Sequence, residues 1–222
     1  MKISVVMPAY NEAKTIENAV KAFAHQDAVC EVIVVDGLSE DGTFELVQAL
    51  SKDLPKAKVI RETKRQGKGN AVALGAAAAV GDVIVVQDAD NEIPAEDVIR
   101  VASEVSDSTP VVFGSRFLDP TQECAYPSMT YANKFFTQLF NVRHRTSLTD
   151  VLTGCKAARA SLWKAANLSS KGYEIEIELA EKFHRAAGIV ERPVVFRPRK
   201  NEDGKKIRLK HAFIILRRVF IA

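Results

Sequence analysis

Two aspartates with one residue between them, Asp88 and Asp90, follow the apolar run Val83 to Val86 in the stretch VVQDADNEIP. Adjacent carboxylates repel and raise each other's pKa unless a cation lies between them. Their oxygens suit Mg²⁺ or Mn²⁺, which typically keep phosphate oxygens and waters as further ligands. A DxD pair is also common as an acidic turn before a helix, with Asp90 or Asn91 as the N-cap. The pair alone does not decide between these two interpretations.

A basic, glycine-containing loop, TKRQGKGNA, places Lys64, Arg65 and Lys68 before a predicted helix. Backbone N–H groups, the helix dipole and lysine charge together can bind an anion. The alternative is a solvated basic loop. The Walker spacing GxxxxGK[ST] is absent, and no GxGxxG follows the first predicted strand. A cation-binding pair and an anion-binding loop at one sheet edge favour a metal-bound diphosphate.

The elements that must position these residues alternate along the chain. Apolar, β-branched stretches predict strands, and these are ISVVMPA, CEVIVVD, AKVIRE, GDVIVV and PVVFGS. The amphipathic segments between them predict helices. This alternation predicts an α/β fold, a single domain with a doubly wound, mostly parallel sheet and helices on both faces. Ligands bind beyond the carboxyl ends of such strands, where Glu12 and Asp36 also lie. Later segments predict helices in MTYANKFFTQLFNV and GYEIEIELAEKFHRAAG and a strand in VERPVVFRPR.

Composition is that of an ordinary globular protein, with 222 residues, 47% hydrophobic and 27% charged. The net charge of +3 is too small to argue for nucleic acid. Cys30, Cys124 and Cys155 lack CxxC spacing, which argues against a disulfide framework or zinc site and fits a reducing compartment. The N-terminus lacks the apolar region of a signal peptide, and no stretch approaches the roughly 20 apolar residues of a membrane span. We therefore expect a cytoplasmic protein.

The motifs VVMPAYNE, VIVVDGLSEDGT, RQGKGNAVALG, VVQDAD and VVFGSRF resemble, in order, those of the family-two inverting glycosyltransferases, which have the GT-A fold. LTDVLTGCKAARASLW, GYEIEIEL and ERPVVFRPRKNEDGKKI are similar to the branch of dolichyl- and polyprenyl-phosphate mannose and glucose synthases. The resemblance implies a nucleotide-sugar-binding half over residues 1–117 and an acceptor-binding half over 118–204. A basic amphipathic C-terminal helix over 205–222 completes the expected organisation.

The resemblance also implies roles for individual residues. The nucleoside-diphosphate sugar, of GDP-mannose or UDP-glucose type, is expected at Pro8, Tyr10, Glu12, Val35, Asp36, Lys68, Asp88 and Ala89. Mg²⁺ or Mn²⁺ is expected at Asp88, Asp90 and Glu92, and the catalytic set is Asp90, Arg116, Arg199 and Lys206. Departures from the family's pattern stand at three positions. Gly37 occupies the place of the second acid in the family's usual VDDGS, and Glu92 stands where the closest synthases often have glutamine; Glu174 also stands where some have lysine.

The expected reaction is inverting transfer of a hexose to a polyprenyl or dolichyl phosphate. A lipid phosphate is ionised at neutral pH, so it needs positive charge to position it rather than a base, and Arg116, Arg199, Lys205 and Lys206 offer that charge. Three alternatives stay open. The acceptor could be a glycan hydroxyl, which needs a carboxylate base; the Gly37 change could mark a non-catalytic nucleotide-sugar-binding protein; and Arg116 could serve only in a structural ion pair.

The tail KKIRLKHAFIILRRVFIA places basic residues around a short apolar core, Phe213 to Leu216. The core is too short to span a bilayer, but a basic amphipathic helix can lie at an anionic membrane surface. The prediction is a peripheral protein at the cytoplasmic face of the membrane. The alternative is a helix packed on the sheet or on a second subunit, so a homodimer also stays open. No nucleic-acid partner is expected.

Overall fold

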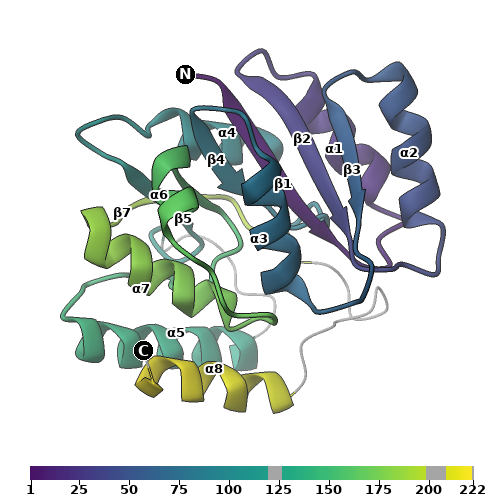
Figure 1. Ribbon diagram of the computed structural model, residues 1–222. Helices are drawn as coiled ribbons and strands as arrows, with labels where there is room; N and C mark the ends of the chain where they lie inside the picture. Colours follow the sequence, from purple (N-terminus) through teal and green to yellow (C-terminus); the bar gives the residue numbers. More distant parts are fainter. Residues whose placement is uncertain (120–126, 199–208, 222) are drawn as a thin grey trace.

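The computed structural model describes residues 1–119, 127–198 and 209–221. Its sheet has seven strands in the order β3-β2-β1-β4-β6-β5-β7 (Figure 1). The strands are β1 (Ile3–Ala9), β2 (Val29–Asp36), β3 (Ala57–Arg61), β4 (Val83–Val86), β5 (Val111–Ser115), β6 (Lys156–Arg159) and β7 (Val190–Pro193). Every neighbouring pair is parallel except those made by β6, which runs antiparallel to β4 and β5. The predicted doubly wound, mostly parallel α/β sheet is confirmed.

Helices cover both faces of the sheet, as predicted. One apolar core joins the sheet to α1 (Ile16–Ala24), α2 (Thr43–Asp53) and α4 (Ala95–Ser103). A second core on the other face joins it to the remaining helices, which are α3 (Lys68–Ala78), α5 (Pro127–His144), α6 (Ala160–Ala165), α7 (Ile175–Ala187) and α8 (Leu209–Ile221). The central strands β1 and β4 are buried along their whole length, as expected for strands covered on two sides.

Helix α3 packs closely on the sheet at Gly75, in the second half of the helix. A Cβ on Gly75 would lie 2.4 Å from Cγ1 of Val6 on β1 and 3.2 Å from Cγ2 of Val35 on β2. Real Cβ atoms do not approach other atoms that closely, so only glycine allows this approach. This contact holds α3, whose first residue is Lys68, against β1 and β2.

The short strand β6 and the helix α6 were not predicted from the sequence. The β6 segment is KAAR, which has neither β-branched nor aromatic residues. It forms a strand because Ala157 and Ala158 are small enough to be fully buried between β4 and β5. Tertiary packing has overridden local propensity here, and it places the charged residue Lys156 inside the sheet.

Helix α8 lies side by side with α5 and also contacts α7 (Figure 1). Ile215 and Val219 of α8 are buried in the second core, and Nη2 of Arg218 lies 2.9 Å from Glu181 Oε2 of α7. Helix α8 thus packs on other helices of the chain, while Phe213, Ile214 and Phe220 are exposed, and its contact with a membrane stays a prediction. Within the described ranges, no helix is long and apolar enough to cross a membrane.

Candidate active site

The predicted nucleoside residues meet at the point where strand order reverses. Strand β1 has β2 on one side and β4 on the other, and its register places Pro8 beside Val35 and Ala9 beside Asp36. Tyr10 and Glu12 follow β1 directly. Ligands of open α/β sheets bind at such a switch point, so the structure brings these predicted residues together at the expected edge.

Three loops at this edge use a non-glycine residue in the left-handed backbone region. These are Asn11 after β1 (φ 51°), Leu38 after β2 (φ 60°) and Asn91 after β4 (φ 58°). Side chains other than Asn and Asp seldom adopt this conformation, and such strain concentrates at functional sites. Of these three residues, Leu38 is the one whose side chain makes this conformation strained, because Asn adopts it readily.

The acid Asp36 is fully buried at the end of β2. Its Oδ2 accepts a hydrogen bond from the Ser39 N–H at 3.1 Å and lies 3.8 Å from Nε of Arg61. On the neighbouring loop, the guanidinium of Arg65 lies 3.4 Å above the centre of the Tyr10 ring, a cation–π contact. Glu12 is buried and accepts a hydrogen bond from Thr15 Oγ1 at 3.2 Å.

A chain of alternating charges runs from the DxD loop into the core. Lys68 Nζ lies 2.7 Å from Asp88 Oδ1 and 2.7 Å from Glu176 Oε1. Glu176 in turn bonds Lys156, whose ammonium also donates to the Thr153 carbonyl. Of the four charged groups, Asp88 is the one nearest solvent, and Lys156 is fully buried. The network Asp88–Lys68–Glu176–Lys156 therefore connects the candidate site to the interior of the sheet.

Burial and pairing act in opposite directions on the pKa values in this network. Burial alone would lower the pKa of Lys68, but the charges of Asp88 and Glu176 raise it. Burial alone would raise the pKa of Glu176, but Lys156 and Lys68 hold it below its usual range. Burial lowers the pKa of Lys156, because Glu176 compensates only in part. At neutral pH we expect Lys68 charged and Glu176 ionised.

The glycine-rich loop differs from the anion site that its sequence predicts. The N–H groups of Gly69 and Asn70, at the start of α3, donate to the Lys171 carbonyl at 2.8 and 3.3 Å. Lys68 is engaged by two carboxylates. The segment before α7 therefore covers the N-terminus of α3. The exposed positive charge of this loop comes instead from Lys64 and Arg65.

The DxD loop turns sharply around Asn91. Ala89 is buried, and Asp90 Oδ1 accepts a hydrogen bond from the Glu92 N–H at 3.1 Å. Among the residues that the structure describes, no three His, Cys, Asp or Glu side chains converge into a metal-binding group. The predicted set with Glu92 is therefore not assembled. Hard carboxylate oxygens from Asp88 and Asp90 do fit Mg²⁺ or Mn²⁺, provided that further ligands come from a diphosphate.

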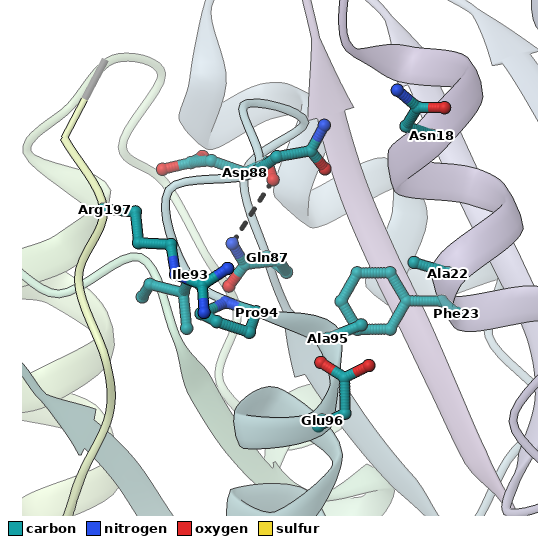
Figure 2. A pocket seen from close by; sticks show the side chains of 11 residues that line it. Asn18, Ala22, Phe23, Gln87, Asp88, Ile93, Pro94, Ala95, Glu96 and Arg197 are labelled. Atoms are coloured by element: carbon teal, nitrogen blue, oxygen red, sulfur yellow. Dashed lines mark hydrogen bonds between the residues drawn. The ribbon is translucent and has the colours of Figure 1, made fainter.

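A cavity of about 250 Å³ lies beside this loop, between α1 and the start of α4 (Figure 2). Figure 2 shows Arg197 reaching from the segment after β7 toward Pro94. The Arg197 N–H donates to the Glu92 carbonyl at 2.7 Å. The lining residues are Asn18, Ala22, Phe23, Gln87, Asp88, Asn91, Ile93, Pro94, Ala95, Glu96 and Arg197. The basic side chain of Arg197 thus lies beside the DxD loop, a placement that the sequence did not predict.

The predicted acceptor residue Arg116 forms a two-pronged ion pair with Asp150. Its Nε lies 2.7 Å from Oδ2 and its Nη2 lies 2.8 Å from Oδ1 of this fully buried acid. Burial would lower the pKa of Arg116, but Asp150 raises it. Glu191 of β7 holds the acid in place, because its carboxylate accepts the N–H groups of Thr149 at 2.7 Å and Asp150 at 2.9 Å. Asp150 is therefore the acid that Arg116 would need if it served in a structural ion pair, which is one of the alternatives left open by the sequence.

Three predicted basic residues, Arg199, Lys205 and Lys206, lie outside the described residues. Sequence reasoning missed Glu176, Lys156 and Asp150 as members of the charge networks. Asp150 and Lys156 lie within motifs that carry the resemblance, LTDVLTGCKAARASLW, and Glu176 lies in GYEIEIEL. A charged residue inside an otherwise apolar or small-residue stretch is the signal that could have marked them.

Comparison with known proteins identifies relatives. The family "Glycosyl transferase family 2" matches residues 4–165. The chain is 31% identical to the dolichol-phosphate mannosyltransferase of Pyrococcus furiosus, over 99% of this chain and 63% of that protein. It is 26% identical to the undecaprenyl-phosphate mannosyltransferase of Micrococcus luteus, over 92% of this chain and 87% of that protein. The chain thus spans somewhat less than two thirds of the length of the P. furiosus relative.

A solved structure with the same fold is glucosyl-3-phosphoglycerate synthase from Mycobacterium tuberculosis, in complex with Mn²⁺, uridine diphosphate and glucosyl-3-phosphoglycerate. The TM-score is 0.74 at 23% identity, covering 99% of this chain and 78% of that one. This likeness concerns the fold and confirms the GT-A type. Because the family match covers most of the sequence, this chain belongs to glycosyl transferase family 2.

Proposed function

We propose that this chain is an inverting glycosyltransferase that moves a hexose from a nucleoside-diphosphate sugar to a polyprenyl phosphate. The observation that carries the proposal is the position of Asp88 and Asp90 at the switch point of the sheet, after β4, with β1 between them and the end of β2 that holds Asp36. Relatives named for dolichol phosphate and undecaprenyl phosphate support the lipid acceptor.

The donor would lie across the ends of β1, β2 and β4. Its nucleoside would rest on Pro8, Tyr10, Glu12, Val35 and Asp36, and its diphosphate would approach Asp88, Ala89 and Asp90. Mg²⁺ or Mn²⁺ held by Asp88 and Asp90 would neutralise charge that develops on the leaving diphosphate. Lys68 would add positive charge behind Asp88, and Arg65 would add it from the exposed loop.

The acceptor phosphate would be positioned by arginine. Arg116 is anchored by Asp150 through two of its three nitrogens, which fixes the direction of its guanidinium. Arg197 stands near the DxD loop at the cavity, and the predicted residues Arg199 and Lys206 follow it in sequence. An ionised phosphate needs no general base, so what the site must supply on the acceptor side is alignment of the phosphate with the anomeric carbon.

We also propose that the outer side of α5 and α8 faces the membrane in which the lipid acceptor lies. Exposed apolar side chains gather on these adjacent helices: Tyr131, Phe135, Val142, Phe213, Ile214 and Phe220. Arg217 is exposed beside them, whereas Arg218 is paired with α7. Aromatic residues next to basic ones suit the interface of an anionic bilayer.

The deciding experiment incubates the purified chain with GDP-mannose or UDP-glucose, a short polyprenyl phosphate, and either Mg²⁺ or Mn²⁺. Glycosyl phosphate lipid with inverted anomeric configuration should form, and a chelator should abolish it. Asp90→Ala should lower the rate by about 10²-fold or more while the thermal midpoint stays close to that of the wild type. Transfer only to a soluble sugar, or full activity with chelator, would contradict the proposal.

A further inference from the structure

Lys68 already contacts the carboxylate that the proposed metal would need. Its Nζ donates to Asp88 Oδ2 at 2.8 Å and lies 2.7 Å from Asp88 Oδ1, so one ammonium group touches both oxygens of the first acid of the DxD pair. The backbone of Gly154 packs against the same carboxylate, because a Cβ there would lie only 2.6 Å from Asp88 Oδ2. Asp88 is thus held by Lys68 and packed against the loop before β6.

A ligand can nevertheless reach this pair. The side chain of Asp88 is 34% exposed and that of Lys68 is 12% exposed, and Asp88 lines the cavity beside the DxD loop. A metal ion that approaches Asp88 meets the ammonium group that already contacts the oxygens it would bind. Two cations that share one carboxylate repel each other, and more strongly where water is partly excluded. Lys68 should therefore weaken the binding of a metal that arrives alone.

Lys68 can release Asp88 only to another anion. Burial would lower the pKa of Lys68, but Asp88 and Glu176 outweigh burial and raise it, so the group does not leave by losing its proton. Glu176 Oε1 lies 2.7 Å from Lys68 Nζ and would remain as one partner. A diphosphate could supply the other, because ammonium groups form strong, charge-assisted hydrogen bonds with phosphate oxygens.

We propose that Lys68 is a positioning residue that makes metal binding depend on the diphosphate of the donor. Without nucleotide, Lys68 holds Asp88 and opposes the metal. When the nucleoside diphosphate arrives, its oxygens bind the ammonium group and complete the ligands of the metal, while Glu176 keeps its contact with Lys68. This inference rests on the proposed function and adds an order of binding to it: the metal enters with the nucleotide or after it.

Neutral substitutions of Lys68 separate its charge from its packing. Lys68→Met keeps much of the length of the side chain, and Lys68→Gln is a second neutral variant. In both, Glu176 stays paired with Lys156 and Asp88 stays partly exposed, so we expect a folded chain with a lower thermal midpoint. Lys68→Arg retains the charge. The matched control is Lys171→Met, which removes an exposed ammonium group that donates to Gln66 at 2.7 Å.

The experiment measures two affinities for the full chain and each variant. The electron paramagnetic resonance signal of free Mn²⁺ gives the affinity for the metal alone, and calorimetry with GDP or UDP in excess Mn²⁺ gives that for the metal–nucleotide complex. Lys68→Met and Lys68→Gln should bind Mn²⁺ alone at least about 10-fold tighter than the wild type. They should bind the complex no tighter, because the diphosphate has lost a partner. Lys68→Arg should resemble the wild type, as should Lys171→Met, whose charge is screened by solvent.

Three outcomes would overturn this inference while Mn²⁺–GDP or Mn²⁺–UDP binding by the wild type still supports the proposed function. The first is a Mn²⁺ affinity that rises in neither neutral variant. The second is an equal rise in Lys171→Met. The third is the same gain for Mn²⁺ alone and for the complex, since the diphosphate would then have no effect on Lys68. A wild type that binds neither complex would contradict the proposed function as well.

Discussion

Glu176 is the one residue in the charge network that contacts both buried lysines, Lys68 and Lys156. Its carboxylate offsets two ammonium groups that would otherwise lie close together in a medium of low polarity. Each of those charges loses most of its hydration on burial, so the network is stable only while all its members are present. Asp88, at the solvent end, is the member through which a ligand could change this balance.

Replacing Glu176 with glutamine keeps the shape of the side chain and removes its charge. We expect the free energy of unfolding to fall by about 3–5 kcal/mol, as for other broken buried pairs. Urea denaturation measures this loss. Glu174→Gln is the matched control, because Glu174 precedes α7 and its carboxylate accepts the N–H groups of Lys171 and Gly172 on the adjacent loop. A loss below about 1 kcal/mol in Glu176→Gln would show that Lys68 and Lys156 do not depend on it.

The pair Arg116–Asp150 permits a separation of stability from acceptor binding. Arg116→Ala should lower the free energy of unfolding by about 3–5 kcal/mol, because it leaves Asp150 buried and unpaired. Arg116→Ala/Asp150→Ala should recover much of that stability, since no lone charge remains. If Arg116 also grips the acceptor, the double variant should still show a raised KM for polyprenyl phosphate and unchanged nucleotide affinity. Recovery of both stability and KM would restrict Arg116 to a structural role.

At the scale of elements, Glu178 of α7 holds the loop that leads from α6. Its carboxylate accepts the N–H groups of Ser169 at 3.0 Å and Ser170 at 2.7 Å, and lies 2.8 Å from Nζ of Lys182. Burial would raise the pKa of Glu178, but hydrogen bonds from Lys182 and Ser170 outweigh it and lower the pKa to about 2. The same loop carries Lys171, whose carbonyl covers the start of α3.

This lowered pKa gives a pH dependence with a definite sign. The ordinary pKa is 4.5, so the stabilising contribution of Glu178 is complete above that value and is lost as pH falls toward 2. The difference in free energy of unfolding between the wild type and Glu178→Gln should therefore shrink by about 2 kcal/mol between pH 6.5 and pH 3. Chemical denaturation at the two pH values measures it. A constant difference would show that the carboxylate is not ionised preferentially in the folded state.

The sequence predicts long elements well and distant pairings poorly. The buried strands β1, β2 and β4 follow from apolar stretches rich in Val and Ile, and the switch point follows from their alternation with helices. The strand β6 could not be predicted, because KAAR becomes a strand only between two finished neighbours. The contact of Lys68 with Glu176 joins α3 to α7, and depends on how both helices pack on the sheet. Asp88 and Asp90 were found because their short spacing is visible locally.

At the scale of the whole molecule, the exposed apolar side chains of α5 and α8 give the proposed membrane face a test. Phe213 is 72% exposed and Phe220 is 60% exposed. We expect the chain to float with anionic liposomes and to detach as salt rises, because screening weakens the attraction. Phe213→Ser/Phe220→Ser and Arg217→Glu should each reduce flotation several-fold.

The control for flotation is Val80→Ser, at an apolar residue that is 73% exposed after α3. Arg218→Glu is not a suitable test, because it would disrupt the ion pair with Glu181 and loosen α8. If flotation is unchanged in both Phe213→Ser/Phe220→Ser and Arg217→Glu, α8 has a packing role only. Equal losses in Val80→Ser would indicate nonspecific adhesion.

The strand β6, from the predicted acceptor half, lies between β4 and β5 of the predicted nucleotide-sugar half. A fragment of residues 1–117 would lack this strand and leave the edges of β4 and β5 unpaired. We expect such a fragment to aggregate or to lack a cooperative unfolding transition, because exposed edges invite association. Circular dichroism and size-exclusion chromatography of the fragment and the full chain provide the comparison. A soluble, cooperatively folded fragment would show that the first half is self-sufficient.

This interleaving limits how the protein can change over time. Where a donor unit and an acceptor unit are joined end to end, recombination can exchange one for another in a single event. Here the exchange would have to replace the interior strand β6 together with Lys156. It would therefore disturb the charge network that runs from Lys156 to Asp88. New acceptor preferences should therefore arise by point substitutions on the existing scaffold, around Arg116 and Arg197, rather than by acquisition of a foreign second half.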